Sequence, residues 1–327
     1  MTAVGFKGLG IYIPAKILTN ADIEKIVDTT DEWIRTRTGI IERHIAAPNE
    51  QTSDLATKAA TEALKDAKIK ADDIDLIIVA TISPDSNFPA VACIVQKNIG
   101  AHKAFAFDVS AACSGFLFAL TTAKQYVLSG MSKNALVIAA EKITTLIDWK
   151  DRSTCVLFGD VAGAAVIGSV KDGGIVADYM LSYGEQGDLM KVVAGNARSP
   201  LAPQQDDALK LPYVVMQGQE LFKMAVNSMA EAVEQVLTKA GLTKEDVDMV
   251  VPHQANDRII SAVAKKLDIP KDKIFVNIDK YGNMSAASIS VALYEAVRSG
   301  QIKKGSVVVL VTFGAGLVAA ANVVRWN

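Results

Sequence analysis

Two hydrophobic periods alternate along the chain. Apolar runs of five to nine residues, rich in Val, Ile and Ala, predict strands that are buried on both faces. They span residues 75–81, 104–109, 135–141, 154–159, 162–168, 248–253, 274–278, 306–313 and 317–325. Longer stretches with apolar residues three and four positions apart predict amphipathic helices. The main helix candidates span residues 53–67, 114–130, 218–241, 256–268 and 285–300.

This alternation predicts an α/β protein with a largely parallel sheet and helices on both faces. The order of elements in residues 1–172 is repeated in residues 173–327, and each half ends in a hairpin-like apolar pair, at 155–168 and 308–324. A repeat of half the chain indicates an internal duplication rather than a solenoid. We therefore predict two related halves that meet near KDGG, residues 171–174.

The amino-acid composition excludes several classes of protein for this chain. The 327 residues are 50% hydrophobic with a net charge of −2, which disfavours disorder and gives no reason to expect nucleic acid or membrane partners. No apolar run reaches the roughly 18 residues of a membrane span, and no signal peptide is recognisable at the start. Three cysteines without CxxC spacing and three histidines without zinc spacing predict a reducing cytoplasmic setting and no metal site. The polar stretch 195–212 is expected to run over the surface as a loop or lid.

Three polar residues follow strand candidates in comparable places. Cys113 comes after 104–109, His253 ends 248–253, and Asn283 follows 274–278. Sites in open α/β sheets form beyond the carboxyl ends of strands, so we expect these side chains to meet near a pseudo-twofold axis. Taken singly, His253 is also readable as a core histidine and Asn283 as a turn residue.

The surroundings of Cys113 favour a reactive thiol. A helix start offers the positive end of the macrodipole and free N–H groups, and both favour the thiolate. Small neighbours in AACSG, residues 111–115, leave room for a substrate carbonyl. The alternative is a buried structural cysteine. The turn FGAG, residues 313–316, either joins two strands tightly or lends backbone N–H groups to an oxyanion.

Six motifs in a fixed order resemble one enzyme family from end to end. They are DEWIRTRTGIIERHIA (31–46), AACSGF (111–116), DRSTCVLFGDVAGAAV (151–166), VPHQANDRII (251–260), YGNMSAAS (281–288) and FGAG (313–316). Together they resemble the β-ketoacyl-acyl carrier protein synthase III family, the initiating condensing enzymes of type II fatty-acid synthesis. The resemblance implies a thiolase-like fold of five αβαβα layers, built from duplicated halves, and a homodimer.

The resemblance also implies a reaction. An acyltransferase of this family condenses a short acyl-CoA primer, acetyl-CoA in the first place, with malonyl-acyl carrier protein and releases CO2. It implies the triad Cys113, His253 and Asn283, with backbone N–H groups of Cys113 and Ala315 as oxyanion hole. His253 is expected to be a neutral donor. No cofactor is implied, because CoA enters as part of the substrate.

Asn283 and the absence of a later cysteine separate the branches of this superfamily. Elongating condensing enzymes carry a second histidine where this chain has Asn283. Thiolases need a second cysteine near the C-terminal Gly-rich turn, and this chain has none after Cys155. Two alternatives stay open: an acyl-CoA condensing or acyl-transfer enzyme of secondary metabolism, and a non-catalytic subunit of a condensing heterodimer.

Binding residues follow from the resemblance in the same way. Trp33, Arg37 and Arg152 match CoA-binding positions, with the adenine between Trp33 and Arg152. Arg258, Lys265 and Lys266 are expected to dock the acidic carrier protein. Solvated helix faces are the alternative for both groups.

Four further residues and one short segment complete the sequence-based predictions. Phe88 matches a residue that lines the acyl pocket of a dimer partner, with packing in its own core as the competing explanation. Met284 departs from the family's usual Thr and is expected to crowd the surroundings of Asn283. Cys93 and Cys155 lie in apolar patterns and are interpreted as structural. The segment Val318–Ala320 replaces a familiar Thr-Trp-Gly without an explanation from the sequence.

Overall fold

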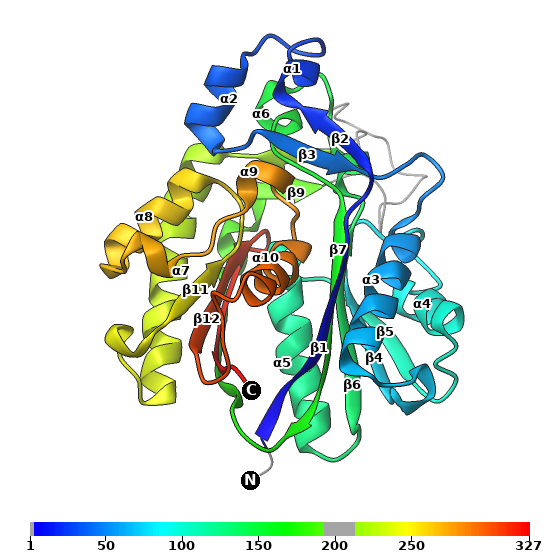
Figure 1. Ribbon diagram of the computed structural model, residues 1–327. Coiled ribbons are helices and arrows are strands. Elements are labelled where there is room, and N and C mark those ends of the chain that lie inside the picture. The colour runs from blue at the N-terminus through cyan, green and yellow to red at the C-terminus, as the bar shows by residue number, and fades with distance from the viewer. Residues whose placement is uncertain (1–2, 193–212) are drawn as a thin grey trace.

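The computed structural model describes residues 3–192 and 213–327, and its main strands form two mixed sheets (Figure 1). The first sheet has the order β1-β7-β6-β4-β5, with β1 Ala3–Tyr12, β4 Leu76–Ala80, β5 Phe105–Val109, β6 Asn134–Glu141 and β7 Val161–Val170. The second has the order β11-β12-β13-β8, with β8 Gly174–Ser182, β11 Met249–Pro252, β12 Val307–Gly314 and β13 Val318–Arg325.

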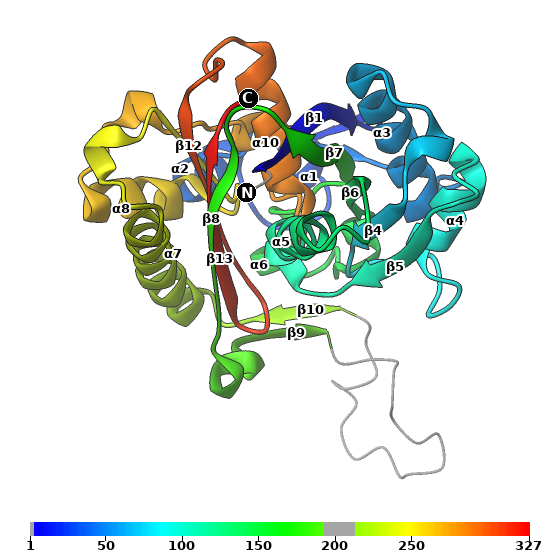
Figure 2. The same cartoon turned by 90° about the horizontal axis from the view of Figure 1, so that it is seen from below.

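Helices cover the outer faces of both sheets and fill the space between them, which gives five layers (Figure 2). The outer helices are α3 Thr52–Ala67 and α4 Val91–Ile99 on the first sheet, and α7 Gly218–Ala240 and α8 Asp257–Leu267 on the second. The central helices are α5 Gly115–Leu128 and α10 Ala287–Arg298. Both faces of this central layer are covered by sheets, so α5 and α10 carry long apolar runs, in which Phe116 and Ile289 are fully buried.

The two sheets repeat one strand order. β4, β6, β7 and β1 correspond to β11, β12, β13 and β8, and in each sheet the first pair is parallel and the next two are antiparallel. A parallel bridge between Val250 and Ile274 stands where β5 pairs with β4 in the first sheet. The residue 172 boundary falls between β7 and β8; the assignment of two halves to 1–172 and 173–327 stays a prediction.

Several predicted strands are wrong. The sheets are mixed rather than largely parallel, because apolar residues on both faces report burial and not strand direction. Residues 154–159 form no strand: the Asp151 carboxylate accepts the Ser153 N–H at 2.8 Å and starts the short helix α6 Arg152–Cys155. Residues 274–278 contribute one bridge before α9 Ile278–Tyr281. The hairpin predicted at 155–168 is therefore absent, whereas the one at 308–324 is β12 and β13.

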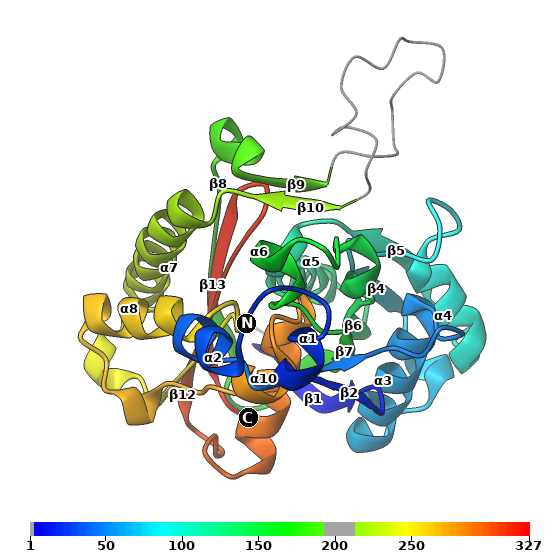
Figure 3. The same cartoon turned by 90° about the horizontal axis from the view of Figure 1, so that it is seen from above.

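Smaller elements gather over the ends of the two sheets (Figure 3). They are α1 Asn20–Ile23, α2 Asp31–Thr38, the pair β2 Lys16–Thr19 with β3 Glu42–Ile45, and the pair β9 Met190–Val192 with β10 Val214–Met216. None of the helices in the described ranges has the length and hydropathy to cross a membrane. The predicted surface stretch 195–212 lies outside the described residues.

Candidate active site

Cys113 lies in the turn that joins β5 to α5. Residues Ala112–Ser114 form one 3₁₀ turn, and the Cys113 side chain is only 4% exposed. Ala112 has a φ of +44°, a strained conformation of the kind that gathers at functional sites. Gly314 of the second sheet packs so closely that a Cβ would lie 2.8 Å from the Cys113 nitrogen. Both halves of the chain therefore fix this turn.

Burial dominates the electrostatics of the Cys113 thiol. The pKa of Cys113 is raised to about 12, mainly because burial removes the thiolate from water, with a smaller raising contribution from the Glu141 carboxylate. The hydrogen bond from Sγ to Ser285 Oγ at 3.7 Å acts in the opposite direction. Burial therefore acts against the thiolate that the helix start is expected to favour. Desolvation outweighs the N–H groups of the turn, so the pKa of the thiol is raised and not lowered.

Asn283 lies in the loop between α9 and α10, and the segment 157–159 holds its backbone. The Asn283 N–H donates to the Leu157 carbonyl at 2.8 Å, and its carbonyl accepts from the Gly159 N–H at 3.1 Å. Its side-chain oxygen accepts the Ser285 N–H at 2.9 Å. Because that oxygen is occupied, the amide Nδ2 is the atom left to donate to a ligand.

His253 directly follows β11. Its N–H donates to the Val311 carbonyl at 2.8 Å, which extends the parallel ladder with β12 by one residue. The side chain is buried, and burial lowers the pKa of His253 to about 3, so the imidazole is neutral near pH 7. Its Nδ1 is buried without a hydrogen-bond partner among the described residues. A proton on Nε2 therefore leaves no buried N–H unpaired.

One cavity brings these three side chains together. Cys113, His253 and Asn283 line its floor, and apolar residues such as Phe158 and Phe222 form its walls. A second hollow continues from it toward the surface, and the two share Leu157, Met216, Gly218, Phe222 and Asn256. This outer hollow, called the mouth below, is also lined by Trp33, Arg37 and Arg258. A passage thus leads from an indole and two guanidinium groups to a buried thiol.

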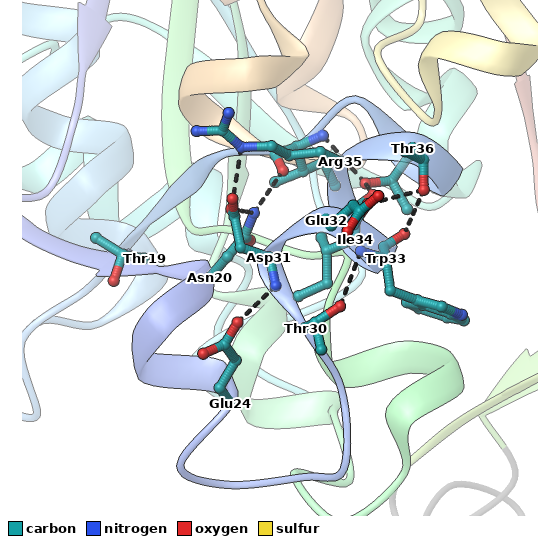
Figure 4. A network of polar contacts seen from close by, with 12 residues as sticks. Thr19, Asn20, Glu24, Thr30, Asp31, Glu32, Trp33, Ile34, Arg35 and Thr36 are labelled. Carbon is teal, nitrogen blue, oxygen red and sulfur yellow. Dashed lines mark hydrogen bonds and ion pairs between the residues drawn. The ribbon is translucent and has the colours of Figure 1, made fainter.

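A polar network holds α2 at the mouth (Figure 4). Thr30 caps the helix by accepting the Trp33 N–H at 3.1 Å, while Asp31 donates its N–H to Glu24 at 2.6 Å and its carboxylate accepts from the Asn20 amide at 2.8 Å. The Trp33 indole points away from this network (Figure 4). The network therefore orients the indole without contacting it.

Two guanidinium groups flank the Trp33 indole. The Arg152 guanidinium carbon lies 4.9 Å from the ring centroid and that of Arg37 lies 5.4 Å away. An aromatic ring stacked between Trp33 and Arg152 needs about 7 Å, which is two van der Waals contacts. Arg152 therefore has to move outward before an adenine fits between them.

Comparisons with known proteins agree with this geometry. The family model for 3-oxoacyl-[acyl-carrier-protein (ACP)] synthase III matches residues 107–184, and the model for its C-terminal part matches residues 237–326. The β-ketoacyl-[acyl-carrier-protein] synthase III of Caldanaerobacter subterraneus subsp. tengcongensis is 54% identical over 326 residues, covering 99% of this chain and 98% of the relative. That of Clostridioides difficile is also 54% identical, covering 100% and 99%. The chain belongs to the β-ketoacyl-[acyl-carrier-protein] synthase III family.

Solved structures of synthase III enzymes share the fold. The crystal structure from Aquifex aeolicus superposes with a TM-score of 0.92 at 49% identity, covering 99% of this chain and 100% of that one. The structure from Thermus thermophilus gives a TM-score of 0.93 at 44% identity, covering 99% of both chains. The thiolase-like α/β fold expected from the sequence is therefore confirmed.

The basic residues expected to dock a carrier protein are all exposed on α8. Of the three, Arg258 lines the mouth of this synthase III chain, whereas Lys265 and Lys266 lie about two turns further along the helix. Lys266 donates to the Asn227 side chain at 2.5 Å. The Asn256 amide donates to the Arg37 carbonyl at 3.0 Å and so ties the start of α8 to α2.

Phe88 is 84% exposed, which excludes packing in the core of its own chain. The neighbouring Ser86 and Asn87 line a further cavity on the other side of the Cys113 turn, together with Ala112 and Val318. Ala315 lines this further cavity, called the second cavity below, and not the passage that leads from the mouth to Cys113. The thiol thus stands between two hollows. Val318 and the residues after it form β13, which gives the unexplained segment a place in the fold.

Three expectations about sulfur-containing residues have different outcomes. Met284 does not crowd the site, because its side chain is fully buried in the core between the sheets. Cys155 is buried, on α6 rather than on a strand. Cys93 is exposed on α4, where its Sγ donates to the Ala106 carbonyl at 3.6 Å, and its interpretation as structural stays a prediction. No group of three or more His, Cys, Asp and Glu side chains in the described ranges is arranged to hold a metal ion.

Sequence reasoning missed Glu141 and Ser285. Glu141 is the last residue of β6 and is fully buried, and its carboxylate accepts the Ser285 hydroxyl at 3.1 Å. A carboxylate that ends an otherwise apolar strand was the available signal, since such strand ends line sites in α/β proteins. Ser285 stands two residues after Asn283 within the recognised motif.

Proposed function

We propose that this chain condenses a short acyl-CoA primer with malonyl-acyl carrier protein to give a 3-oxoacyl-acyl carrier protein, the initiating step of type II fatty-acid synthesis. One observation carries the proposal: a buried thiol shares the floor of a surface-opening passage with two neutral donors, His253 and Asn283. Cys113 is the proposed nucleophile. Acetyl-CoA is the proposed primer.

The first half-reaction is transfer of the acyl group to Cys113. The sulfur attacks the thioester carbonyl, the bond to CoA sulfur breaks, and an acyl-cysteine remains. We assign the backbone N–H groups of Cys113 and Ala315 to the oxyanion, because the Gly314 contact brings the two turns together.

The second half-reaction is decarboxylation of the malonyl group. Loss of CO2 places negative charge on the malonyl thioester oxygen, and hydrogen bonds from His253 and from the Asn283 amide stabilise that charge as it forms. The carbanion then attacks the acyl-cysteine carbonyl and expels the Cys113 sulfur. A neutral imidazole suits this role, because the step needs a donor and not a base.

The exposed side chains at the mouth suit the binding of CoA and of the acyl carrier protein. Trp33 and Arg152 are proposed to hold the adenine of CoA, after Arg152 has moved, and Arg37 its phosphates. Arg258, Lys265 and Lys266 are proposed to contact the acidic carrier protein beside the same opening. The reducing cytoplasm stays a prediction.

We propose a homodimer through the edge of the first sheet. β5 is an edge strand of that sheet, so its outer N–H and C=O groups are unpaired within the sheet. Phe105 on β5 is 39% exposed, and the 84% exposed Phe88 lies in the loop before α4, the helix that packs on β5. A second copy at this edge would cover both side chains and bring Phe88 of each copy to the second cavity of the other. A large Phe at that place shortens the cavity, and a short cavity suits a short acyl group.

The deciding experiment is incubation of the purified chain with a panel of acyl-CoA thioesters, read by intact mass. A gain of one acyl group, largest for acetyl and absent in Cys113→Ser, supports the proposal. A gain only with longer or branched groups reassigns the primer. No adduct with any thioester contradicts the proposed nucleophile and favours a non-catalytic subunit.

A further inference from the structure

A buried chain of polar contacts leads away from the Cys113 thiol. The thiol donates to Ser285 Oγ at 3.7 Å, and the Ser285 hydroxyl donates to Glu141 Oε1 at 3.1 Å. Ser285 and Glu141 are fully buried and Cys113 nearly so. Among the described residues, the Ser285 hydroxyl is the acceptor that the structure gives this thiol.

Three hydrogen bonds occupy one oxygen of the Glu141 carboxylate, and the other oxygen faces Ser285. Its Oε2 accepts from Ser83 Oγ at 2.6 Å, from the Ile82 N–H at 3.2 Å and from Thr81 Oγ1 at 3.3 Å. Its Oε1 faces Ser285, with a longer contact of 3.4 Å to the Ile82 N–H. The carboxylate is thereby fixed in rotation, and a proton that arrives from Ser285 reaches Oε1.

The protonation states fit a transfer between these groups. A thiol with a pKa of about 12 cannot supply a useful fraction of thiolate at pH 7, so acylation needs a base. Burial raises the pKa of Glu141 to about 7, partly offset by its hydrogen bonds. A base with a pKa near the working pH transfers protons most efficiently. His253 makes no hydrogen bond to the thiol among the described residues, and its pKa of about 3 makes it a poor base.

We infer that Ser285 and Glu141 form a proton relay that takes the Cys113 proton during acylation and returns it after condensation. This inference rests on the proposed function. In acylation, the thiol proton passes to Ser285 Oγ while the Ser285 hydroxyl proton passes to Glu141 Oε1. The sulfur forms its bond to the acyl carbon, and CoA leaves as a thiolate that takes one proton from solvent.

The relay closes in the second half-reaction. When the carbanion attacks the acyl-cysteine, the bond from carbon to Cys113 sulfur breaks and a thiolate is released. Glu141 then returns its proton through Ser285, which restores the neutral thiol. The cycle consumes one proton, the one taken up by CoA, and this matches the loss of the malonyl carboxylate as CO2.

Three other ionisable groups lie around Glu141. Cys113 faces it from the turn before α5, and its charge coupling to Glu141 is part of the shift described above. Lys142 follows Glu141 in the chain, but its ammonium is turned to the carbonyls of Ala47, Pro48 and Glu50. Asp160 precedes the neighbouring strand β7 and accepts from the Ala46 and Thr144 N–H groups. The side chains that hydrogen-bond to Glu141 in the described part of the chain are the hydroxyls of Thr81, Ser83 and Ser285.

The test is the pH dependence of Cys113 acylation by acetyl-CoA, followed by rapid quench and intact mass from pH 5 to 10. In the wild type we expect the rate to rise with pH through an apparent pKa near 7 and then to level off, since Glu141 has to be ionised to accept a proton. Glu141→Gln and Ser285→Ala should each slow acylation at pH 7 by about 100-fold. Both should lose the step near pH 7, so that their rates keep rising as hydroxide forms the thiolate.

Two further variants separate a relay from a structural effect. Ser288→Ala is the matched control, because its buried hydroxyl has no partner among the described residues; it should keep the wild-type rate and pH step. Glu141→Asp should recover part of the rate together with the step. Where Glu141→Gln fails to fold, Ser285→Ala decides by itself.

The outcomes separate the relay from the function on which it rests. A wild type that forms no acyl-enzyme contradicts the proposed function. If the wild type is acylated, and Glu141→Gln and Ser285→Ala react at the wild-type rate, the relay is wrong and the function stands. A pH step near 7 that persists in Glu141→Gln also overturns the relay, because another group is then titrating.

Discussion

The two halves of the molecule share one scaffold and carry different chemistry. At the carboxyl ends of β4 and β6 the first sheet has Thr81 and Glu141, with Cys113 after β5. At the corresponding ends of β11 and β12 the second sheet has His253 and the Gly-rich turn. In the proposed mechanism the first half supplies the nucleophile and the carboxylate that takes its proton, and the second supplies neutral donors. The shared strand order places both groups of side chains at equivalent strand ends, and the residue types differ between the two sheets.

Burial shifts the pKa values of the residues in the two halves in opposite directions, and in both cases it favours the neutral form. It raises the pKa of Cys113 and Glu141 and lowers that of His253, because in each case the charged form loses its hydration. Burial therefore favours the neutral form of all three groups, and Glu141, with a pKa of about 7, stays able to exchange a proton near neutral pH. Variants can test whether each half-reaction belongs to one half of the chain.

Removal of the proposed nucleophile from the first half should have the largest effect on activity. Cys113→Ala should reduce acyl-enzyme formation by about 10⁶-fold, the scale seen when a catalytic nucleophile is deleted. Intact mass after incubation with acetyl-CoA measures this loss. Cys93→Ala, which changes an exposed cysteine, is the control. An acyl adduct that survives in Cys113→Ala would assign the chemistry to another residue.

Removal of the donors should affect the second half-reaction. His253→Ala and Asn283→Ala should each slow malonyl-acyl carrier protein decarboxylation by about 10²–10³-fold, as when one oxyanion donor is lost. The effect on Cys113 acylation should be smaller. Release of labelled CO2 measures the first rate and intact mass the second, with the exposed His102→Ala as control. Equal losses in both assays would contradict the division between the halves.

A smaller effect concerns stability and pH. Glu141 has a folded pKa of about 7 against 4.5 for its ordinary value, so the folded state is penalised as pH rises through this window. Relative to wild type, Glu141→Gln should gain roughly 2–3 kcal/mol of unfolding free energy between pH 5 and pH 8. Urea unfolding at both pH values measures the gain. A difference between variant and wild type that does not change with pH contradicts a buried, titrating Glu141.

His253 is expected to oppose this trend in the wild type. Its folded pKa of about 3 lies below the ordinary 6.5, so the unfolded chain binds the extra proton and stability falls as pH drops below 6.5. The two buried groups partly cancel between pH 5 and pH 8. The comparison of Glu141→Gln with wild type at each pH removes the His253 contribution from the difference.

The smallest expected effect lies at the mouth, where the two halves meet. Arg37→Ala should raise the KM for acetyl-CoA about tenfold, equivalent to about 1.4 kcal/mol, with little change in kcat. Arg35→Ala is a matched control on the same helix, because Arg35 pairs with Asp31 at 3.0 Å and lies outside the mouth lining. Steady-state kinetics compare the two. Equal KM values for the two variants would remove Arg37 from the proposed CoA site.

Local patterns predicted the regular parts of the fold well. The helix predicted at 218–241 is α7 and the strand at 306–313 is β12, because long periodic runs have one way to bury their apolar side. The strands at 154–159 and 274–278 failed, because short apolar runs also suit buried turns when a cap such as Asp151 is present. Strands β1 and β8 escaped prediction because glycine and polar residues interrupt their apolar pattern.

The class of fold, the repeated order of elements and the residues of the recognised motifs could be read from the amino-acid sequence alone. These features depend on periodicity and on residue type, which are local properties of the chain. Packing in three dimensions raises the pKa of Cys113 and places Met284 in the core. It also joined Ser285 and Glu141, 144 residues apart, to the thiol. Burial and contact between distant segments set these properties, and neither is written in any one stretch of sequence.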